Sequence, residues 1–267
     1  MNENLPVGII DSGVGGLTAL LQVKKLLADE SIVYVGDSER MPYGNLSSAE
    51  IVSNANEMIS FLEQKKVKVI LLACNTISAN ISSLKSSVKL ISVVKAGARA
   101  LAKAQKSGKI GMIATCATVK SGVYEKELKS LNPDLELVSN SSALLPKIID
   151  SELENINLIE DSIKKCVDPI LSVHTGIDKI LLGCTHFPII KKEISRLYPS
   201  VDFIDPAGEL VIMLKDFLCE NSLSAKNPQS RIDIYTTAES YEYAAAIKRL
   251  KIEIDTLSKV KLTEAPK

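Results

Sequence analysis

The sequence contains two versions of one stretch, Val69-Ile-Leu-Leu-Ala-Cys74-Asn-Thr76 and Lys179-Ile-Leu-Leu-Gly-Cys184-Thr-His186. In each version an apolar run of strand length ends in a small residue, which is followed by a cysteine and then by polar residues. A continuous apolar run is typical of a buried parallel strand, and open α/β sheets bind ligands beyond the carboxyl ends of such strands. We therefore expect both strands to deliver a thiol into one active-site crevice, as two opposed acid/base groups.

Strand-like runs alternate with helix-length segments along the chain. The expected strands cover residues 7–10, 32–35, 67–72, 90–94, 109–113, 135–138, 179–182, 201–204 and 232–235. Helix-like stretches include residues 17–27, 47–64, 121–130 and 158–173. This alternation predicts right-handed βαβ units and an α/β fold with mainly parallel sheets. Residues 259–267 have the composition of a frayed tail.

Two pairs of similar elements lie at nearly equal separations. Cys74 and Cys184 are 110 residues apart, while Asp11 and Thr115, which follow two other predicted strands, are 104 residues apart. Nearly equal offsets predict a duplicated α/β unit. We expect two pseudo-symmetric, doubly wound parallel-sheet domains with the active site at their interface. Residues 1–97 plus 208–267 would carry Asp11 and Cys74, and residues 98–207 would carry Cys184 and His186.

The charge balance and the amino terminus narrow the class of partner. The chain has 32 basic and 32 acidic residues, so it has no net charge that would favour a nucleic acid or a membrane surface, and a small polar substrate fits better. Residues 1–10 lack the basic start and apolar stretch of a signal peptide, and no apolar run approaches the roughly 20 residues of a membrane span. We expect a cytoplasmic protein.

The chain has five cysteines, an odd number without a CxxC pair, so we expect free thiols. Cys116, Cys166 and Cys219 lack the strand-end setting of the other two and are expected to pack as small hydrophobic residues. Cys184-Thr-His186 could supply two zinc ligands, but the second clustered pair of a structural site is missing. The only other histidine is His174, and we expect no metal.

Polar residues also follow the first two strands. The segment Asp11-Ser-Gly-Val-Gly-Gly16 has neither the G-x-G-x-x-G order nor a Walker lysine, so it predicts a tight turn into a helix rather than a nucleotide site. A carboxylate at the end of a buried strand is unfavourable unless it is paired or used, which makes Asp11 a functional candidate. In the segment from Gly36 to Gly44, Tyr43 and Gly44 are candidate substrate contacts. For Asp37, Glu39 and Arg40, a surface loop and a substrate contact are equally compatible with the sequence.

The sequence has two strand-end thiols, with an acid near one and a histidine near the other. In this arrangement it resembles the glutamate racemases of the cofactor-independent aspartate/glutamate racemase superfamily. The resemblance runs over nearly the whole chain through DSGVGG (11–16), GDSERMPYG (36–44), ACNTISA (73–79), ATCATVKSG (114–122) and GCTHFP (183–188). It implies that L- and D-glutamate are interconverted without a cofactor. It also implies that the D-glutamate serves bacterial peptidoglycan synthesis and that the protein is a homodimer.

The resemblance further implies roles for single residues. Cys74 would act on the D-isomer and Cys184 on the L-isomer, and we expect Asp11 to assist Cys74 and His186 to assist Cys184. The implied substrate-binding residues are Asp11, Ser12, Tyr43, Gly44, Asn75, Thr76, Thr118, Thr185 and His186.

The chemistry of racemisation suits this set of residues. Inversion removes a proton from one face of the α-carbon and delivers another to the opposite face, so one base per face is the minimal arrangement. Free cysteine titrates near ~8.5, close enough to neutrality to serve as acid or base. Without a cofactor, donors aimed at the substrate carboxylate must stabilise the developing negative charge, and closure of the two halves about a hinge would exclude water.

The sequence departs from the family pattern in places. Many relatives carry an acidic-Pro-Gly-x-Arg stretch where this chain has Lys95-Ala-Gly-Ala-Arg99. Relatives also carry a glutamate three residues after the proline that corresponds to Pro146, where this chain has Ile149. Asp150 or Glu152 could replace that acid. Rival hypotheses are a sister racemase acting on aspartate or a hydantoin, a non-catalytic amino-acid-binding or regulatory protein, and a thiol redox protein.

Overall fold

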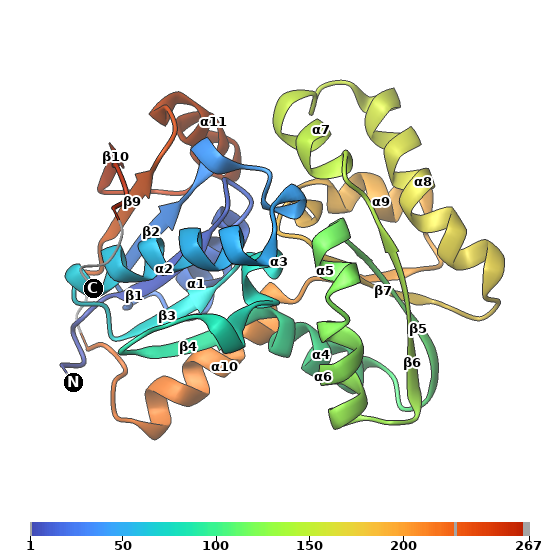
Figure 1. Cartoon of the computed structure of the whole chain (residues 1–267), viewed down its shortest axis with the longest axis horizontal. Coiled ribbons are helices and arrows are strands. Elements are labelled where there is room, and N and C mark those ends of the chain that lie inside the picture. Colours follow the sequence, from blue (N-terminus) through green and yellow to red (C-terminus); the bar gives the residue numbers. More distant parts are fainter. Residues whose placement is uncertain (1, 227–228, 264–267) are drawn as a thin grey trace.

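The structure, a computed structural model, describes residues 2–226 and 229–263. It contains two sheets, which lie side by side in Figure 1. The larger sheet has the strand order β10-β9-β2-β1-β3-β4 and the smaller has the order β6-β5-β7-β8. Within the described residues, every strand pairing is parallel. The α/β fold class is therefore confirmed.

The strand bounds agree closely with the predicted ones. The first sheet is built from β1 (Val7–Asp11), β2 (Ile32–Gly36), β3 (Val69–Leu72), β4 (Lys89–Ser92), β9 (Ile232–Thr236) and β10 (Thr256–Lys259). The second is built from β5 (Gly108–Ala114), β6 (Leu135–Ser141), β7 (Lys179–Gly183) and β8 (Asp202–Ile204). The order β2-β1-β3-β4 recurs as β6-β5-β7-β8, as expected of a duplicated unit.

Helices cover both faces of each sheet. On the first sheet, α1 (Leu17–Leu26), α10 (Ala207–Glu220) and α11 (Ser240–Leu250) pack on one face, and α2 (Ser48–Gln64) packs on the other. On the second, α4 (Val93–Ala104) and α6 (Val123–Leu131) pack on one face, and α7 (Leu145–Ser151), α8 (Ile156–Val173) and α9 (Lys191–Leu197) on the other. Shorter elements follow the strand ends: η1 (Ser38–Arg40), η2 (Tyr43–Asn45), α3 (Asn75–Ser78), η3 (Ile81–Ser83), α5 (Cys116–Lys120) and η4 (Phe187–Ile190).

Local sequence explains where these elements begin. β1 and β3 are buried along their whole length, which explains their unbroken apolar runs. Ser47 and Glu50 form a capping box at the start of α2. The strand predicted over residues 90–94 ends at Ser92, because the Ser92 side chain accepts a hydrogen bond from the Lys95 amide and so starts α4.

The frayed tail predicted over residues 259–267 begins one residue too early, because Lys259 is the last residue of a strand. Thr256–Lys259 form β10, which pairs with β9 at the edge of the first sheet. Residues 260–263 follow this strand, and residues 264–267 lie outside the described residues.

The chain crosses between the two sheets through α4 and α10. The predicted boundaries, at residues 97 and 208, fall inside α4 and at the start of α10, so each crossover is a helix rather than a linker. Glu209 of α10 pairs with two basic residues of α4. Lys103 Nζ donates to both carboxylate oxygens at 2.7 Å, and Arg99 Nε lies 3.0 Å from Oε1. These ion pairs join the two crossovers where a hinge would lie. The domain boundaries themselves stay a prediction.

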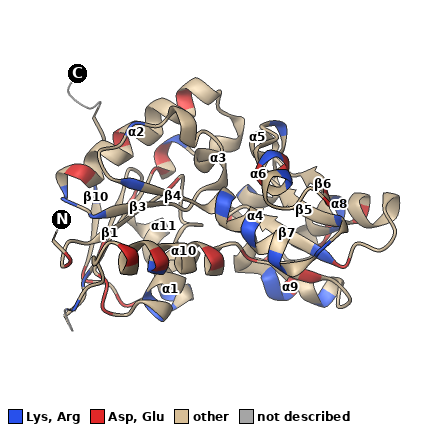
Figure 2. Cartoon of the chain, turned by 90° about the horizontal axis from the view of Figure 1, so that it is seen from below, with Lys and Arg blue, Asp and Glu red and all other residues tan. Residues whose placement is uncertain are grey.

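The surface carries both signs of charge. Figure 2 shows that the positions of both basic and acidic residues are spread along the ribbon of both halves, in keeping with the equal numbers of each. Among the described helices, none combines the length and apolarity needed to cross a lipid bilayer.

Candidate active site

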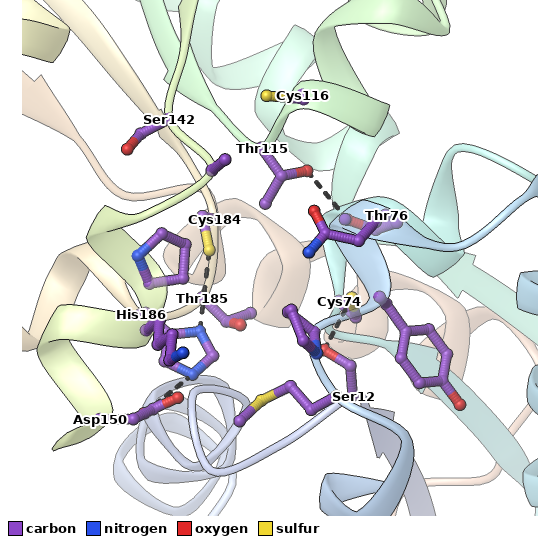
Figure 3. A pocket seen from close by; sticks show the side chains of 18 of the residues that line it. Ser12, Cys74, Thr76, Thr115, Cys116, Ser142, Asp150, Cys184, Thr185 and His186 are labelled. Atoms are coloured by element: carbon purple, nitrogen blue, oxygen red, sulfur yellow. Dashed lines mark hydrogen bonds and ion pairs between the residues drawn. The ribbon is translucent and has the colours of Figure 1, made fainter.

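A cavity of about 440 Å³ lies between the two halves, beyond the carboxyl ends of the central strands. Nine predicted site residues line it: Ser12, Tyr43, Gly44, Cys74, Asn75, Thr76, Cys184, Thr185 and His186. Cys74 follows β3 and Cys184 follows β7, which occupy equivalent positions in the two sheets. Figure 3 shows the two cysteines on either side of this space. The repeated strands thus bring both thiols to one site.

Cys74 is held by the turn between β3 and α3. Its side chain is buried, and its sulfur lies 3.4 Å from Ser12 Oγ and accepts a hydrogen bond from the Ile77 amide. Burial, together with the nearby Asp11 carboxylate, raises the pKa of the Cys74 thiol to about 12 despite these hydrogen bonds. Cys74 is therefore a thiol at neutral pH.

Cys184 lies beside a charged pair. Its sulfur is 3.7 Å from His186 Nδ1, and His186 Nε2 is 3.1 Å from Asp150 Oδ1 (Figure 3). The latter contact has the distance of an ion pair but not the alignment of a hydrogen bond. Burial favours the neutral ring, but the Asp150 carboxylate and the Cys184 sulfur together outweigh burial and hold the pKa of His186 well above its usual range. A cationic imidazole therefore lies next to the Cys184 sulfur.

Asp150 resolves the choice between two candidate acids. It extends from α7 into the cavity wall, whereas Glu152 is exposed at the end of that helix. Ile149 is buried in the core of the second half. The acid that contacts His186 thus lies one residue after the position at which relatives carry a glutamate.

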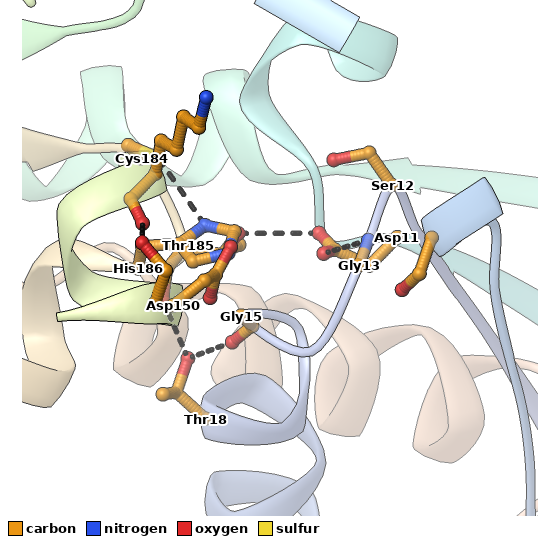
Figure 4. A network of polar contacts seen from close by, with 12 residues as sticks. Asp11, Ser12, Gly13, Gly15, Thr18, Asp150, Cys184, Thr185 and His186 are labelled. Carbon is orange, nitrogen blue, oxygen red and sulfur yellow. Dashed lines mark hydrogen bonds and ion pairs between the residues drawn. The ribbon is translucent and has the colours of Figure 1, made fainter. Parts of the chain in front are cut away.

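Asp11 lies behind the cavity lining. Its Oδ2 accepts the Gly13 amide at 3.0 Å, and its Oδ1 accepts the Thr185 hydroxyl at 3.3 Å, so it connects the two halves (Figure 4). Burial raises the pKa of Asp11 to about 6, against the opposing effects of His186 and the hydrogen bonds. Its effect on Cys74 is electrostatic, and the polar side chain that contacts the Cys74 sulfur is that of Ser12.

Gly15 permits the close approach of the two halves. A Cβ atom at Gly15 would lie 2.6 Å from Thr185 Oγ1 and 2.7 Å from His186 Nδ1, both too short for van der Waals contact. The glycine-rich turn after β1 therefore has a packing role that the sequence pattern alone did not reveal.

Hydroxyl groups from both halves meet on another wall. Thr76 Oγ1 lies 3.0 Å from Thr115 Oγ1 and 3.4 Å from Thr118 Oγ1, and the latter two are 2.9 Å apart. Thr118 was predicted to bind substrate, but it is fully buried behind Thr115, which lines the cavity in its place.

The loop after β2 is anchored from behind. Asp37 is fully buried and accepts the hydroxyls of Tyr43 and Thr237 and Nε of Arg40. The surface-loop alternative is therefore wrong for Asp37, and its contacts are with protein groups. They fix Tyr43 and Gly44 at the cavity wall.

Sequence reasoning missed several lining residues. Thr115, Cys116, Ser142 and Lys147 also line the cavity, and so does Asp150, one of the two acids that the sequence left open. Of these, Thr115 could have been found from its strand-end position, equivalent to Asp11. Ser142 and Lys147 belong to the segment before and within α7, which carries no motif of its own.

All five cysteines are free thiols, as expected. Cys166 is buried, Cys116 is half-buried at the cavity, and Cys219 is exposed, so the packing prediction is wrong for Cys219. Across residues 2–226 and 229–263, no three His, Cys, Asp or Glu side chains are grouped so as to hold a metal ion.

Comparison with known proteins agrees with this geometry. Residues 16–214 match the family model of the Asp/Glu/hydantoin racemases. The chain belongs to the Asp/Glu/hydantoin racemase family. It is thus an isomerase of the amino-acid racemase class.

Individual relatives of this racemase match over most of their length. Glutamate racemase 1 of Caldanaerobacter subterraneus subsp. tengcongensis is 35% identical over 244 residues, which cover 91% of each chain. The crystal structure of glutamate racemase isoform RacE1 from Bacillus anthracis matches with a TM-score of 0.92 at 34% identity, covering 98% of this chain and 99% of that one. The glutamate racemase of Francisella tularensis, solved with D-glutamate, matches with a TM-score of 0.87 at 32% identity, covering 97% and 98%.

Proposed function

We propose that this racemase interconverts L- and D-glutamate with two thiols and no cofactor. The observation that carries the proposal is the pair of buried cysteines, Cys74 and Cys184, which face one cavity from equivalent strand ends of two halves. Relatives that cover nine-tenths of the chain are named glutamate racemases, which supports glutamate over aspartate or a hydantoin.

The protonation states of Cys74 and His186 suit the reaction from L- to D-glutamate. Cys74 is a thiol that can donate a proton, and the cationic His186 beside Cys184 stabilises a thiolate there through a charge-assisted contact. The Cys184 thiolate takes the α-proton of L-glutamate, and the Cys74 thiol delivers a proton to the opposite face. The reverse reaction begins with the two proton positions exchanged.

The carbanion needs stabilisation that two thiols do not supply. The backbone amides at residues 12, 75, 76 and 185 lie at the turns that line the cavity, as donors for a substrate carboxylate. Because the cavity is enclosed by two halves, donors there act in a medium with little water and are stronger than in solution. The ammonium group of the substrate adds a positive charge that eases formation of a thiolate.

The biological role, the location and the oligomeric state are proposed chiefly from the family. Bacterial relatives named glutamate racemases support a role in supplying D-glutamate for peptidoglycan. A cytoplasmic location and a homodimer are proposed on the same ground, together with the sequence features described above.

Circular dichroism of L-glutamate solutions, with L-aspartate in parallel, tests the activity. The signal of L-glutamate should decay to zero while that of L-aspartate persists, and added pyridoxal phosphate or chelator should leave the rate unchanged. If the L-aspartate signal decayed faster than that of L-glutamate, aspartate rather than glutamate would be the substrate.

Cysteine variants test the mechanism. Cys74→Ser and Cys184→Ser should each lower the racemisation rate by roughly 10²- to 10⁴-fold, the usual contribution of a positioned acid/base group. The exposed Cys219→Ser is the matched control and should keep the full rate. Wild-type turnover in either active-site variant would refute the two-thiol mechanism.

A further inference from the structure

One buried donor at the cavity has no protein partner. Asn75 follows Cys74 directly, is 2% exposed and lines the cavity. Its Oδ1 accepts a hydrogen bond from the Tyr124 hydroxyl at 2.6 Å, whereas its Nδ2, also buried, has no hydrogen-bond partner among the described residues. A buried N–H without a partner is unfavourable, so such a group at a binding cavity indicates a donor that awaits a ligand.

Tyr124 reaches Asn75 from the other half of the molecule. It belongs to α6, is fully buried, and is not one of the cavity-lining residues. Its ring packs on Gly97 of α4, where a Cβ atom would lie 2.7 Å from Tyr124 Cε1 and 2.8 Å from the hydroxyl oxygen. The tyrosine is therefore fixed by packing, and its hydroxyl meets the Asn75 amide from behind the cavity wall.

The hydroxyl determines which end of the amide faces the substrate. Burial raises the pKa of Tyr124 well above its usual value, so the hydroxyl keeps its proton at neutral pH. Among the described residues, the only acceptor for that proton is Asn75 Oδ1. With the carbonyl end engaged, the NH₂ end is the one left for a ligand. The opposite orientation would present a carbonyl oxygen, which repels a carboxylate.

We propose that Tyr124 is a positioning residue for racemisation, whose hydroxyl holds the Asn75 amide so that Nδ2 donates to a carboxylate oxygen of the bound amino acid. This inference rests on the proposed function, because it names the group that receives the substrate carboxylate.

A double-mutant cycle on substrate binding tests the inference. The dissociation constant of D-glutamate is measured by titration calorimetry for the wild type, Tyr124→Phe, Asn75→Ala and the double variant. Tyr124→Phe keeps the ring and should weaken binding roughly three- to tenfold, the effect of one ordinary hydrogen bond. Because Tyr124 acts through Asn75, the double variant should bind no more weakly than Asn75→Ala alone.

Two further variants keep the test decisive. Tyr198→Phe removes a hydroxyl that is bonded to Asp168 at 2.5 Å, away from the cavity, and should bind D-glutamate as the wild type does. Asn75→Asp keeps the acceptor for Tyr124 but replaces the donor with a carboxylate oxygen, so it should bind more weakly than Asn75→Ala. This variant tests the donor even if Tyr124→Phe does not fold.

Three results would overturn the inference. They are unchanged binding in Tyr124→Phe, additive losses in the double variant, and unchanged binding in Asn75→Asp. A wild-type protein that neither binds nor racemises glutamate would instead refute the proposed function, so the two failures are distinguishable.

Discussion

The contact between Asp150 and His186 makes a quantitative prediction for Asp150→Asn. This change removes the charge but keeps the size of a side chain that is 19% exposed, next to an imidazole that is 4% exposed at 3.1 Å. Hydrogen bonds to charged groups contribute about 1.5–3 kcal/mol, and because this ion pair lacks hydrogen-bond alignment we use the lower end of that range, about 1.5–2 kcal/mol. At 1.36 kcal/mol per factor of ten, kcat/KM should fall roughly 10- to 30-fold.

The fall should be equal in both directions. Enantiomers have the same free energy in water, so the equilibrium constant is one and no substitution can change the ratio of the two kcat/KM values. Circular dichroism from pure L- and pure D-glutamate measures both values. Glu152→Gln, which removes an exposed charge two residues away, is the matched control and should retain wild-type rates.

The titration of His186 provides the direct readout. The chain has only two histidines, so ring NMR signals can be assigned by comparison with His174→Gln. In the wild type, His186 should stay protonated well above neutral pH, and in Asp150→Asn its pKa should fall because burial then dominates. Since the folded-state pKa is raised, the stability that the pair contributes is present below about pH 6.5 and is lost as pH rises through that folded pKa. An unchanged His186 titration in Asp150→Asn would refute the reasoning.

Three further predictions concern stability and packing. Asp11 has a pKa of about 6 when folded and about 3.9 when unfolded, so the folded state binds more protons and the wild type loses up to about 3 kcal/mol as pH rises from about 4 to 6. Urea unfolding should therefore show Asp11→Asn gaining stability over the wild type across that range, and a constant difference would contradict this. Gly15→Ala should lower kcat/KM at least roughly tenfold, because its Cβ would displace Thr185 and a 1 Å shift can remove about 10²-fold in rate; unchanged kinetics would show that the turn adjusts freely. Glu209→Gln should lower the free energy of unfolding in urea by about 1 kcal/mol through loss of the contact with Lys103, and an unchanged value would show that the pair is fully screened.

The sequence predicted the central strands β1, β2, β3 and β7 because they are short, apolar and buried along almost their whole length. The repeated Cys74 and Cys184 strands also predicted the duplication, since equivalent strands end at equivalent places in the fold. β10 was missed because Thr256–Lys259 contain one apolar residue, Leu257, and lie at a sheet edge, where no continuous apolar run is required.

Site residues that directly follow strands were predictable, and those that approach through tertiary packing were not. Ser12, Asn75 and Thr185 all follow strands and line the cavity. Tyr124 packs behind the cavity wall from α6, and nothing in the local sequence indicates its contact with Asn75. Asp150 was one of two candidate acids, and only the fold shows that it is the one in contact with His186. Thr115 caps α5 and lines the cavity, whereas Thr118, three residues later, is buried in the first turn of that helix.

Isotope uptake in deuterium oxide tests the central claim of one thiol on each face most directly. Early in the reaction, the glutamate is separated into enantiomers and the α-deuterium of each is measured by mass spectrometry, starting from either isomer. If Cys74 and Cys184 act on opposite faces, the product carries one solvent deuterium while the remaining substrate carries none. Unlabelled product, or substrate that gains deuterium as fast as product does, would contradict the two-thiol account.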